Sequence, residues 1–271
     1  MNLSKKDDRT EQANDLFLGA AEYYERYRVP YPQEVFDWVI NEYRLDGRGR
    51  LLDGGCGTGR VALPLSRWFD EVIAIDPDQE MLHIGQRAAR DNGIANVRFL
   101  NLKAEDLPSA MPPLRLATFG ASFHWMDRVL VANRLHKLIE PAGGLVALSP
   151  SSFWGGREPW QQVVISTIRE WLGEERRAGS GMFEAVPLHQ QCLAHTPFAD
   201  ITVIDIHKTH VWTADSIVGY LYSTSFASRA VLGNLREPFE NDLREHLSRL
   251  SVEDRFAEEI EFSIVSARAS A

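Results

Sequence analysis

Short apolar runs alternate with amphipathic segments between residues 49 and 149. The apolar runs predict strands near 50–53, 72–75, 97–100, 116–120 and 145–148, and helical spacing between them predicts helices near 60–68, 79–92 and 128–139. Pro141-Ala142-Gly143-Gly144 is expected to end the third of these helices before the fifth strand. Strands that alternate with helices predict a doubly wound, parallel α/β sheet with ligands at the carboxyl ends of its strands.

Two later segments also read as strands. Residues 201–211 are rich in β-branched side chains. In residues 258–267, apolar Ile260, Phe262 and Ile264 alternate with polar side chains. Alternation indicates a strand with one polar face, which suits an antiparallel strand at the edge of the sheet.

The remaining segments show helical periodicity. Residues 1–47 contain the stripe Leu16, Phe17, Ala20, Tyr24 and Tyr27, followed by a second amphipathic run over 35–43. In residues 150–200, apolar side chains recur at helical spacing over 160–172, and 213–250 predicts two or three short helices. We interpret 1–47 as an N-terminal helical lid, 48–149 as the core, 150–200 as a helical cap and 201–271 as completion of the sheet with extra helices. The alternative for the cap is an ordinary packing element.

A glycine-rich turn follows the first predicted strand. The sequence from position 51 is Leu-Leu-Asp-Gly-Gly-Cys-Gly-Thr-Gly, and dense glycine is tolerated where a ligand lies against the backbone. The second strand ends in Asp76, the position from which an acid holds ribose hydroxyls in a nucleotide-binding βαβ unit. The two features together predict a nucleotide site.

The spacing of the glycines distinguishes between nucleotides. A dinucleotide fingerprint counted from Gly55 needs glycine at position 60, where this chain has Arg60, and Asp53 would repel a pyrophosphate. The pattern acid-x-Gly-x-Gly-x-Gly over 53–59 resembles the first motif of class I S-adenosylmethionine-dependent methyltransferases. The resemblance implies a Rossmann-like, seven-stranded, mostly parallel sheet with an antiparallel edge strand, and S-adenosylmethionine as cofactor.

Further stretches resemble this family in the expected order. Residues 76–82 are similar to its second motif, 104–108 to the loop beside the adenine amino group, and 121–127 to the end of the fourth strand beside the methyl group. The chain departs from the family at the start of that strand, where Leu114-Arg115 replaces a frequent acid. The residues that the resemblance implies for cofactor binding in the core are Asp53, Gly54, Gly55, Cys56, Gly57, Asp76, Pro77, Met81, Ala104, Glu105, Asp106, Ser122 and Phe123.

His124 is the first candidate for a catalytic base, because the resemblance places it near the methyl group and histidine titrates near neutral pH. The alternative is a residue of the pocket wall. Methyl transfer is an in-line displacement that needs a base only when the acceptor is protonated.

The N-terminal helix supplies a second group of candidates. The resemblance places Tyr27 and Arg28 at the cofactor, because a guanidinium binds a carboxylate such as that of the methionyl group. It also makes Tyr24 a second catalytic candidate and Tyr23 a substrate contact. The alternative is an aromatic stripe on a core helix.

The predicted cap is rich in aromatic side chains and histidines. With Tyr23, His124 and Trp125, we assign Trp154 to the acceptor site, and a flat apolar acceptor is favoured. Each cap residue is equally compatible with an ordinary core, and the cap candidates are Phe153, Trp154, Trp160, Phe183, His189 and His195. The spacing of His189, Cys192 and His195 fits no structural zinc pattern, so we expect no metal.

Composition excludes several classes of partner. The 271 residues include 44% hydrophobic and 25% charged residues, typical of a globular protein, and a net charge of −9 opposes binding to nucleic acid. No apolar run reaches the length of a membrane span, and the polar start has no signal-peptide core, so we expect a cytoplasmic protein that does not bind membranes. Cys56 and Cys192 are expected to be free thiols, and a homodimer is compatible with the sequence.

The sequence therefore predicts an enzyme that methylates an oxygen or nitrogen of a small molecule, a specialised metabolite. One alternative is a nicotinamide-dependent oxidoreductase, since Asp76 suits either ribose. A second alternative is a non-catalytic module that binds S-adenosylmethionine, because fold and binding do not determine function.

Overall fold

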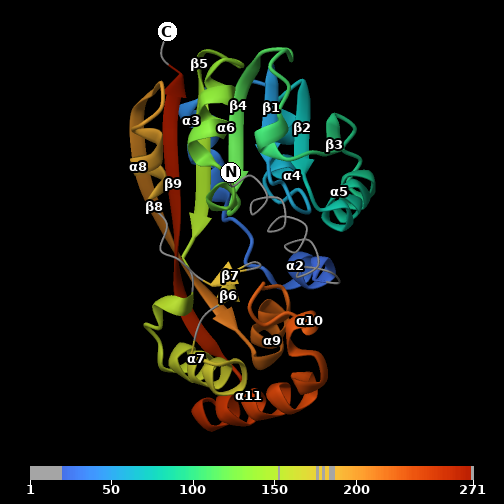
Figure 1. Cartoon of the computed structure of the whole chain (residues 1–271), viewed down its shortest axis with the longest axis vertical. Coiled ribbons are helices and arrows are strands. Elements are labelled where there is room, and N and C mark those ends of the chain that lie inside the picture. The colour runs from blue at the N-terminus through green and yellow to red at the C-terminus, as the bar shows by residue number, and fades with distance from the viewer. Residues whose placement is uncertain (1–19, 152, 175–176, 179–180, 183–186, 270–271) are drawn as a thin grey trace, which may run out of the picture. The chain divides into compact units, whose positions relative to one another are not determined.

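The computed structural model describes residues 20–151, 153–174, 177–178, 181–182 and 187–269 (Figure 1). Its chain divides into two compact units. The sheet unit comprises the described residues within Pro30–Ser151, Val186–Lys208 and Glu261–Ala271, and the helical unit comprises those within Met1–Val29, Ser152–Ala185 and Thr209–Ile260. Each unit is described below by itself.

Seven strands form one sheet in the order β3-β2-β1-β4-β5-β9-β8. Strands β1 to β5 are parallel, and β9 pairs antiparallel with β5. The strands are β1 (Arg50–Gly54), β2 (Glu71–Asp76), β3 (Val97–Asn101), β4 (Leu114–Gly120), β5 (Ile139–Pro150), β8 (Phe198–Trp212) and β9 (Phe256–Ala269). The predicted α/β fold and the seven strands are thus confirmed. The chain order reverses at β1, which pairs with both β2 and β4, and a ligand crevice is expected at this switch point.

Two details differ from the pattern-based expectation. The antiparallel strand β9 lies one place in from the edge, and β8 is the outermost strand. The predicted helix over 128–139 ends earlier, at His136, so the Pro141-to-Gly144 turn lies within β5 and does not end the helix. Strand β5 begins at Ile139 because its register against β4 shifts between Leu114 and Leu116, and this irregularity accommodates the turn.

Helices connect the strands of the sheet unit. They are α3 (Gln33–Glu42), α4 (Ala62–Leu65) with η1 (Ser66–Trp68), α5 (Gln79–Asp91), η2 (Ala104–Asp106), η3 (Phe123–Trp125), α6 (Arg128–His136) and α8 (His189–Leu193). Side-chain caps start two of them. Asp78 accepts hydrogen bonds from the backbone of Glu80 and Met81, and Asp127 accepts one from Leu130.

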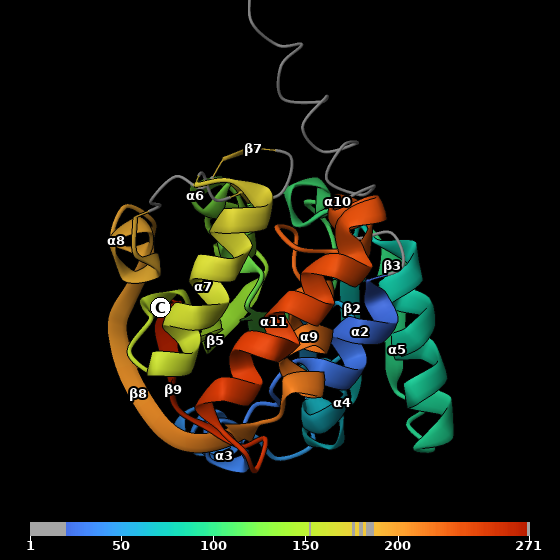
Figure 2. The same cartoon turned by 90° about the horizontal axis from the view of Figure 1, so that it is seen from below.

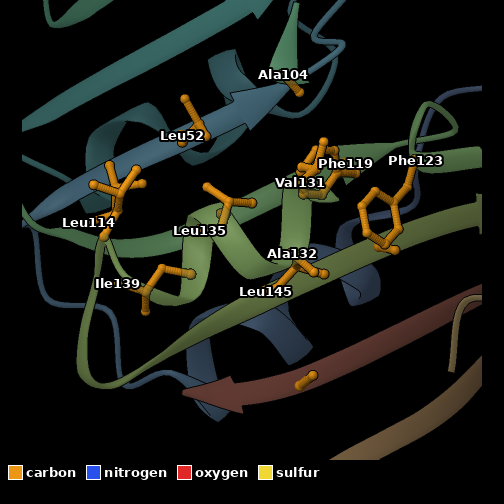
Figure 3. Packing of buried hydrophobic residues seen from close by; sticks show 14 of the residues in the cluster. Leu52, Ala104, Leu114, Phe119, Phe123, Val131, Ala132, Leu135, Ile139 and Leu145 are labelled. Atoms are coloured by element: carbon orange, nitrogen blue, oxygen red, sulfur yellow. The ribbon is translucent and has the colours of Figure 1, made fainter. Parts of the chain in front are cut away.

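One face of the sheet packs against α6 in a single hydrophobic cluster. Val131 and Leu135 of α6 join Leu52, Phe119 and Leu145 of the strands, all buried (Figure 3). Side chains alternate between the two faces of a strand, so Leu51, Leu116 and Val146 point to the opposite face. Both faces are covered, which explains why these strands read as continuous apolar runs.

The remaining helices belong to the helical unit. They are α2 (Ala21–Tyr27), η4 (Phe153–Gly155), α7 (Pro159–Leu172), α9 (Ala214–Tyr222), α10 (Arg229–Leu232), η5 (Gly233–Leu235) and α11 (Arg236–Leu250), with a hairpin of β6 (Arg177–Ala178) and β7 (Gly181–Met182). Helix α11 packs against α7, and α2 packs against α9 (Figure 2). A Cβ atom on Gly219 would lie 2.4 Å from the Tyr27 ring, so glycine is required where α2 meets α9.

Three predicted residues, Leu16, Phe17 and Phe183, lie outside the described residues. Within the part of the chain that the structure describes, every helix is too short or too polar to cross a membrane.

Candidate functional site: the carboxyl edge of the sheet

The turn after β1 adopts backbone conformations that favour glycine. Gly55 and Gly57 have φ values of +63° and +53°. A Cβ atom on Gly55 would lie 2.6 Å from Cβ of Ser122, and one on Gly54 would lie 2.4 Å from the Phe119 ring. The loop is therefore packed tightly against the end of β4, and side chains at these positions would disrupt it.

Asp53, at 1% exposure, ties this loop to its neighbours. Its Oδ2 accepts a hydrogen bond from the Ala62 backbone at 3.0 Å, and its Oδ1 accepts one from the Thr118 hydroxyl at 2.9 Å. Burial raises the pKa of Asp53 to about 7, and the two hydrogen bonds oppose this shift. Asp53 therefore positions the loop against α4 and β4, and its predicted contact with the cofactor stays a prediction.

Asp76 ends β2 on the other side of the same loop. Its Oδ2 accepts a hydrogen bond from the Gly57 backbone and its Oδ1 one from the Asp78 backbone, each at 2.8 Å. Burial raises the pKa of this carboxyl to about 6. An ionised carboxylate offers about four acceptor positions. With these two bonds from the described residues, two positions remain for hydroxyl groups such as those of a ribose.

Thr58 and Cys56, two further residues of the loop, are buried. The Thr58 side chain is 1% exposed, and its hydroxyl oxygen has no hydrogen-bond partner among the described residues. A polar cofactor or a water molecule that reaches Oγ1 would remove the cost of burying it unpaired. Burial also raises the pKa of the free Cys56 thiol, which favours the protonated thiol, and its predicted contact with the cofactor stays a prediction. The glycine loop, Asp76 and the orphan hydroxyl together fit a cofactor with a ribose.

The residues predicted to border the adenine lie at the ends of β2 and β3. Asn101 donates hydrogen bonds to the backbone oxygens of Pro77, at 2.8 Å, and Asp76, at 3.2 Å. Met81 is buried at the start of α5, and Ala104 is buried in η2. Asp106, exposed, follows in the same short helix.

Glu105 has an additional structural contact. Its Oε1 accepts a hydrogen bond from the Asp127 backbone at 2.9 Å, which links η2 to the start of α6. The adenine-binding roles of Ala104, Glu105 and Asp106 stay predictions.

The chain turns sharply where β4 ends. Ala121 has φ = +52°, a strained value for a residue with a side chain, and such strain is concentrated at functional sites. The Ser122 hydroxyl donates to the Gly54 backbone oxygen at 2.6 Å, which joins this turn to the glycine loop. Phe123 is buried against Phe119, with ring centroids 4.5 Å apart. His124, next in sequence, is exposed.

Trp125 and His189 flank His124. The centroids of the Trp125 and His124 rings lie 4.9 Å apart, and Trp125 is 55% exposed. His189 of α8 lies 6.4 Å from His124 and 5.4 Å from Phe123, between ring centroids. Sequence reasoning considered His189 as a residue of the cap and, with Cys192 and His195, as a metal ligand that it rejected. The structure brings it to the end of β4 across more than sixty residues of sequence.

Arg128, the first residue of α6, completes this cluster, and no sequence signal pointed to it. Its guanidinium Nη1 donates to the Pro187 backbone oxygen at 2.6 Å and lies 3.4 Å from Nδ1 of His189. Burial, followed by the positive charge of Arg128, lowers the pKa of His189 to about 4. His189 is therefore a neutral imidazole at pH 7.

The other predicted residues belong to the helical unit. Arg28 donates to the Ser223 hydroxyl at 2.9 Å and to its backbone oxygen at 3.0 Å, and its guanidinium lies over the rings of Tyr24 and Tyr220. The Tyr23 ring is stacked near that of Tyr27, 6.0 Å between centroids.

Trp154, also in the helical unit, meets Phe226 edge to face at 5.1 Å. The packing of Tyr23, Tyr24, Tyr27, Arg28 and Trp154 is thus explained within that unit. Their contacts with cofactor or acceptor stay predictions.

Comparison with known proteins agrees with this geometry. Residues 51–143 match the family model described as "Methyltransferase domain". An uncharacterized methyltransferase of Mycobacterium tuberculosis is 26% identical over 211 residues, which cover 78% of this chain and 76% of the relative. The uncharacterized methyltransferase YcgJ of Bacillus subtilis is 34% identical over 118 residues, 44% of this chain and 47% of that protein.

The crystal structure of YcgJ superimposes with a TM-score of 0.56 at 18% identity, covering 89% of this chain and all of that one. A Saccharomyces cerevisiae protein named as a probable S-adenosylmethionine-dependent methyltransferase is 27% identical over half of this chain. The chain spans 46% of the length of that relative.

The chain has the fold of the class I S-adenosylmethionine-dependent methyltransferases, with the glycine loop and Asp76 at the switch point of its sheet. Its residues 51–143 belong to the methyltransferase-domain family, and the family identifies S-adenosylmethionine as the methyl donor.

Proposed function

We propose that this chain transfers the methyl group of S-adenosylmethionine to an oxygen or nitrogen atom of a small molecule, a specialised metabolite. The observation that supports the proposal is the pairing of Asp76 with the Gly57 backbone at the switch point of the sheet, within one unit with His124. The net charge of −9 disfavours a nucleic acid as acceptor. Cytoplasmic location and a homodimer remain predictions.

The roles at the cofactor follow from the donors and acceptors of the site. The Asp76 carboxylate accepts hydrogen bonds from the two ribose hydroxyls, in addition to those from Gly57 and Asp78. Gly55 and Gly57 adopt positive φ values and carry no side chains, so the cofactor can approach the backbone of this loop. The bound cofactor supplies an electrophilic methyl carbon on a sulfonium sulfur.

At the acceptor, the main requirement is alignment of the nucleophile with the methyl carbon and exclusion of water. His124 lies just after the strained end of β4, exposed and with its ring tilted against that of Trp125. It takes the proton of an acceptor that is protonated at working pH. Trp125 presents an exposed indole face, which suits a flat acceptor.

Residues of the helical unit have proposed roles of their own. Tyr27 and Arg28 bind the cofactor, Arg28 through its methionyl carboxylate, and Tyr23, Tyr24 and Trp154 contact the acceptor. The support is the clustering of these aromatic side chains with a guanidinium in one unit.

Calorimetric titration with S-adenosylmethionine and S-adenosylhomocysteine tests the proposal. We expect both to bind the wild-type chain, and we expect Asp76→Ala to weaken both by roughly thirtyfold or more, since hydrogen bonds to a charged group are lost. Asp91→Ala, an exposed acid at the end of α5, is the matched control and should bind as the wild type does.

Absence of binding to the wild type would refute the proposal. Binding without turnover on a panel of phenols, carboxylic acids and amines would instead favour the non-catalytic module.

A further inference from the structure

The side chains around His124 come from three separate elements of the sheet unit. His124 and Trp125 lie in η3, Arg128 begins α6, and His189 begins α8. The rings of His124 and His189 are 6.4 Å apart and inclined by 30°. The cluster therefore places two imidazoles and a guanidinium beside an exposed indole at the end of β4.

The contact between Arg128 and His189 determines the tautomer of His189. A guanidinium has only N–H donors, so the His189 Nδ1 atom, 3.4 Å from Nη1 of Arg128, acts as the acceptor. A neutral imidazole with an unprotonated Nδ1 has its proton on Nε2. Because burial and Arg128 lower the pKa of His189 to about 4, this neutral form with an Nε2–H donor is present at pH 7.

The charged side chains at the start of α6 are Arg128 and Asp127, and Glu105 of η2 is hydrogen-bonded to the Asp127 backbone. The Asp127 carboxylate accepts from the Leu130 backbone at 3.1 Å, and the Glu105 carboxylate accepts from the Asp127 backbone at 2.9 Å. Arg128 is the charged group whose field acts on His189. At His189, then, the local field is that of a cation.

We propose that His189 and Arg128 form, with His124, a site that selects a phenolic acceptor and holds it as an oxyanion. This inference rests on the proposed methyltransferase function. The aromatic ring of the acceptor lies on Trp125, the hydroxyl hydrogen bonds to His124, and the Nε2–H of His189 donates to the same oxygen.

The chemistry balances without a further reactant. The phenolic O–H bond breaks, and its proton passes to a ring nitrogen of His124. The acceptor oxygen then forms a bond to the methyl carbon while the carbon–sulfur bond breaks, and that electron pair remains on sulfur as a thioether. Negative charge is present on the acceptor oxygen before transfer, where the His189 donor and the Arg128 charge stabilise it.

The same electrostatics disfavour amines. An aliphatic amine is an ammonium ion at neutral pH, and the positive charge of Arg128 repels it. A phenol becomes more acidic beside a cation, since an opposite charge favours the ionised form. The cluster thus discriminates between the two acceptor classes by charge.

A coloured phenol tests this inference without relying on turnover. We would titrate 4-nitrophenol into the chain saturated with S-adenosylhomocysteine, at a pH below the pKa of the free phenol, and record its absorbance. We expect the bound probe to show the phenolate spectrum. Binding as the neutral phenol, or no binding, would overturn the inference.

Variants at His189 distinguish the role of its N–H donor from the packing role of its ring. His189→Phe keeps a ring but removes the donor, and we expect the apparent pKa of the bound probe to rise and the rate with a phenol acceptor to fall about tenfold or more. His189→Gln retains an N–H donor and should partly restore both. His83→Phe, the same change at an exposed histidine of α5, is the matched control and should leave both unchanged.

Thermal unfolding and S-adenosylhomocysteine affinity of each variant establish whether the fold and the cofactor site are intact. If the wild type fails to bind S-adenosylhomocysteine, the proposed function itself is wrong. If S-adenosylhomocysteine binds and His189→Phe leaves the probe spectrum unchanged, only the role of His189 is wrong.

Discussion

The two ends of the site are built from side chains of opposite electrostatic character. At the cofactor end, Asp53 and Asp76 are buried acids whose pKa values are raised to about 7 and about 6. At the acceptor end, His189 is a base whose pKa is lowered to about 4. Burial favours the neutral form of all three groups. Burial thus acts on both ends of the site: it raises the pKa values of the acids at the cofactor end and lowers the pKa of the histidine at the acceptor end.

The two ends also differ in how the chain assembles them. Asp53 and Asp76 are joined by a continuous strand–loop–helix–strand segment, and each accepts a hydrogen bond from a backbone amide of that segment. Asp53 accepts a further one from Thr118 of β4. His124, Arg128 and His189 come from parts of the chain that meet only in the folded sheet unit. The cofactor end is thus a local structure, whereas the acceptor end depends on tertiary packing.

The largest expected effect is a loss of turnover at the acceptor end with cofactor affinity unchanged. His124→Gln should lower turnover by about a hundredfold, because the general base is lost while a polar side chain of similar size remains. The affinity for S-adenosylhomocysteine should stay at the wild-type value. Steady-state kinetics and calorimetry measure the two quantities. An unchanged rate would show His124 to be a wall of the pocket.

A change in the glycine loop should destabilise the fold at the cofactor end. A Cβ atom on Gly54 would lie 2.4 Å from the Phe119 ring, so Gly54→Ala should lower the free energy of unfolding by about 2–3 kcal/mol through overpacking. Gly93→Ala is the matched control, because Gly93 has φ = +67° and no atom within 4 Å of its Cβ position. It should cost only about 1 kcal/mol, from backbone strain. Equal losses in urea denaturation would contradict the close contact with Phe119.

The smallest expected effect concerns pH and has opposite signs at the two ends. In the ligand-free chain, the raised pKa of Asp53 means that the folded state binds more protons than the unfolded state between its usual value of 3.8 and about 7. Its contribution to the free energy of unfolding therefore falls as pH rises through this window. His189 binds fewer protons when folded between about 4 and its usual 6.5, so its contribution falls as pH drops.

Denaturation of variants across this range separates the two contributions. When the pH falls from about 7 to about 5, Asp53 adds to the free energy of unfolding of the wild type and His189 subtracts from it, each on the order of 1 kcal/mol. Asp53→Asn should abolish the first change, and His189→Phe should abolish the second. The difference between wild type and variant is the quantity to follow at each pH. The same sign of change in both variants would contradict the assignment of one of the two pKa shifts.

The fold was predictable from the sequence to a large extent. The five parallel strands lie where the apolar runs predicted them, and the two later strands were found from β-branched composition and alternation. The boundaries were less predictable. The Pro141-to-Gly144 turn reads locally as a helix stop, but in the structure it lies within β5, at the irregularity between the pairs Leu114–Ile139 and Leu116–Gly144.

The sequence by itself determined the class of cofactor site. The glycine loop after one strand and the acid at the end of the next strand are both local features of a βαβ unit. It also singled out His124, from its place after the fourth strand. Only the tertiary structure decided that His189 and Arg128 join His124, since these residues meet through packing of η3, α6 and α8. The physical reason is that short-range spacing determines backbone conformation, whereas burial, pKa and the tautomer of an imidazole depend on neighbours distant in sequence.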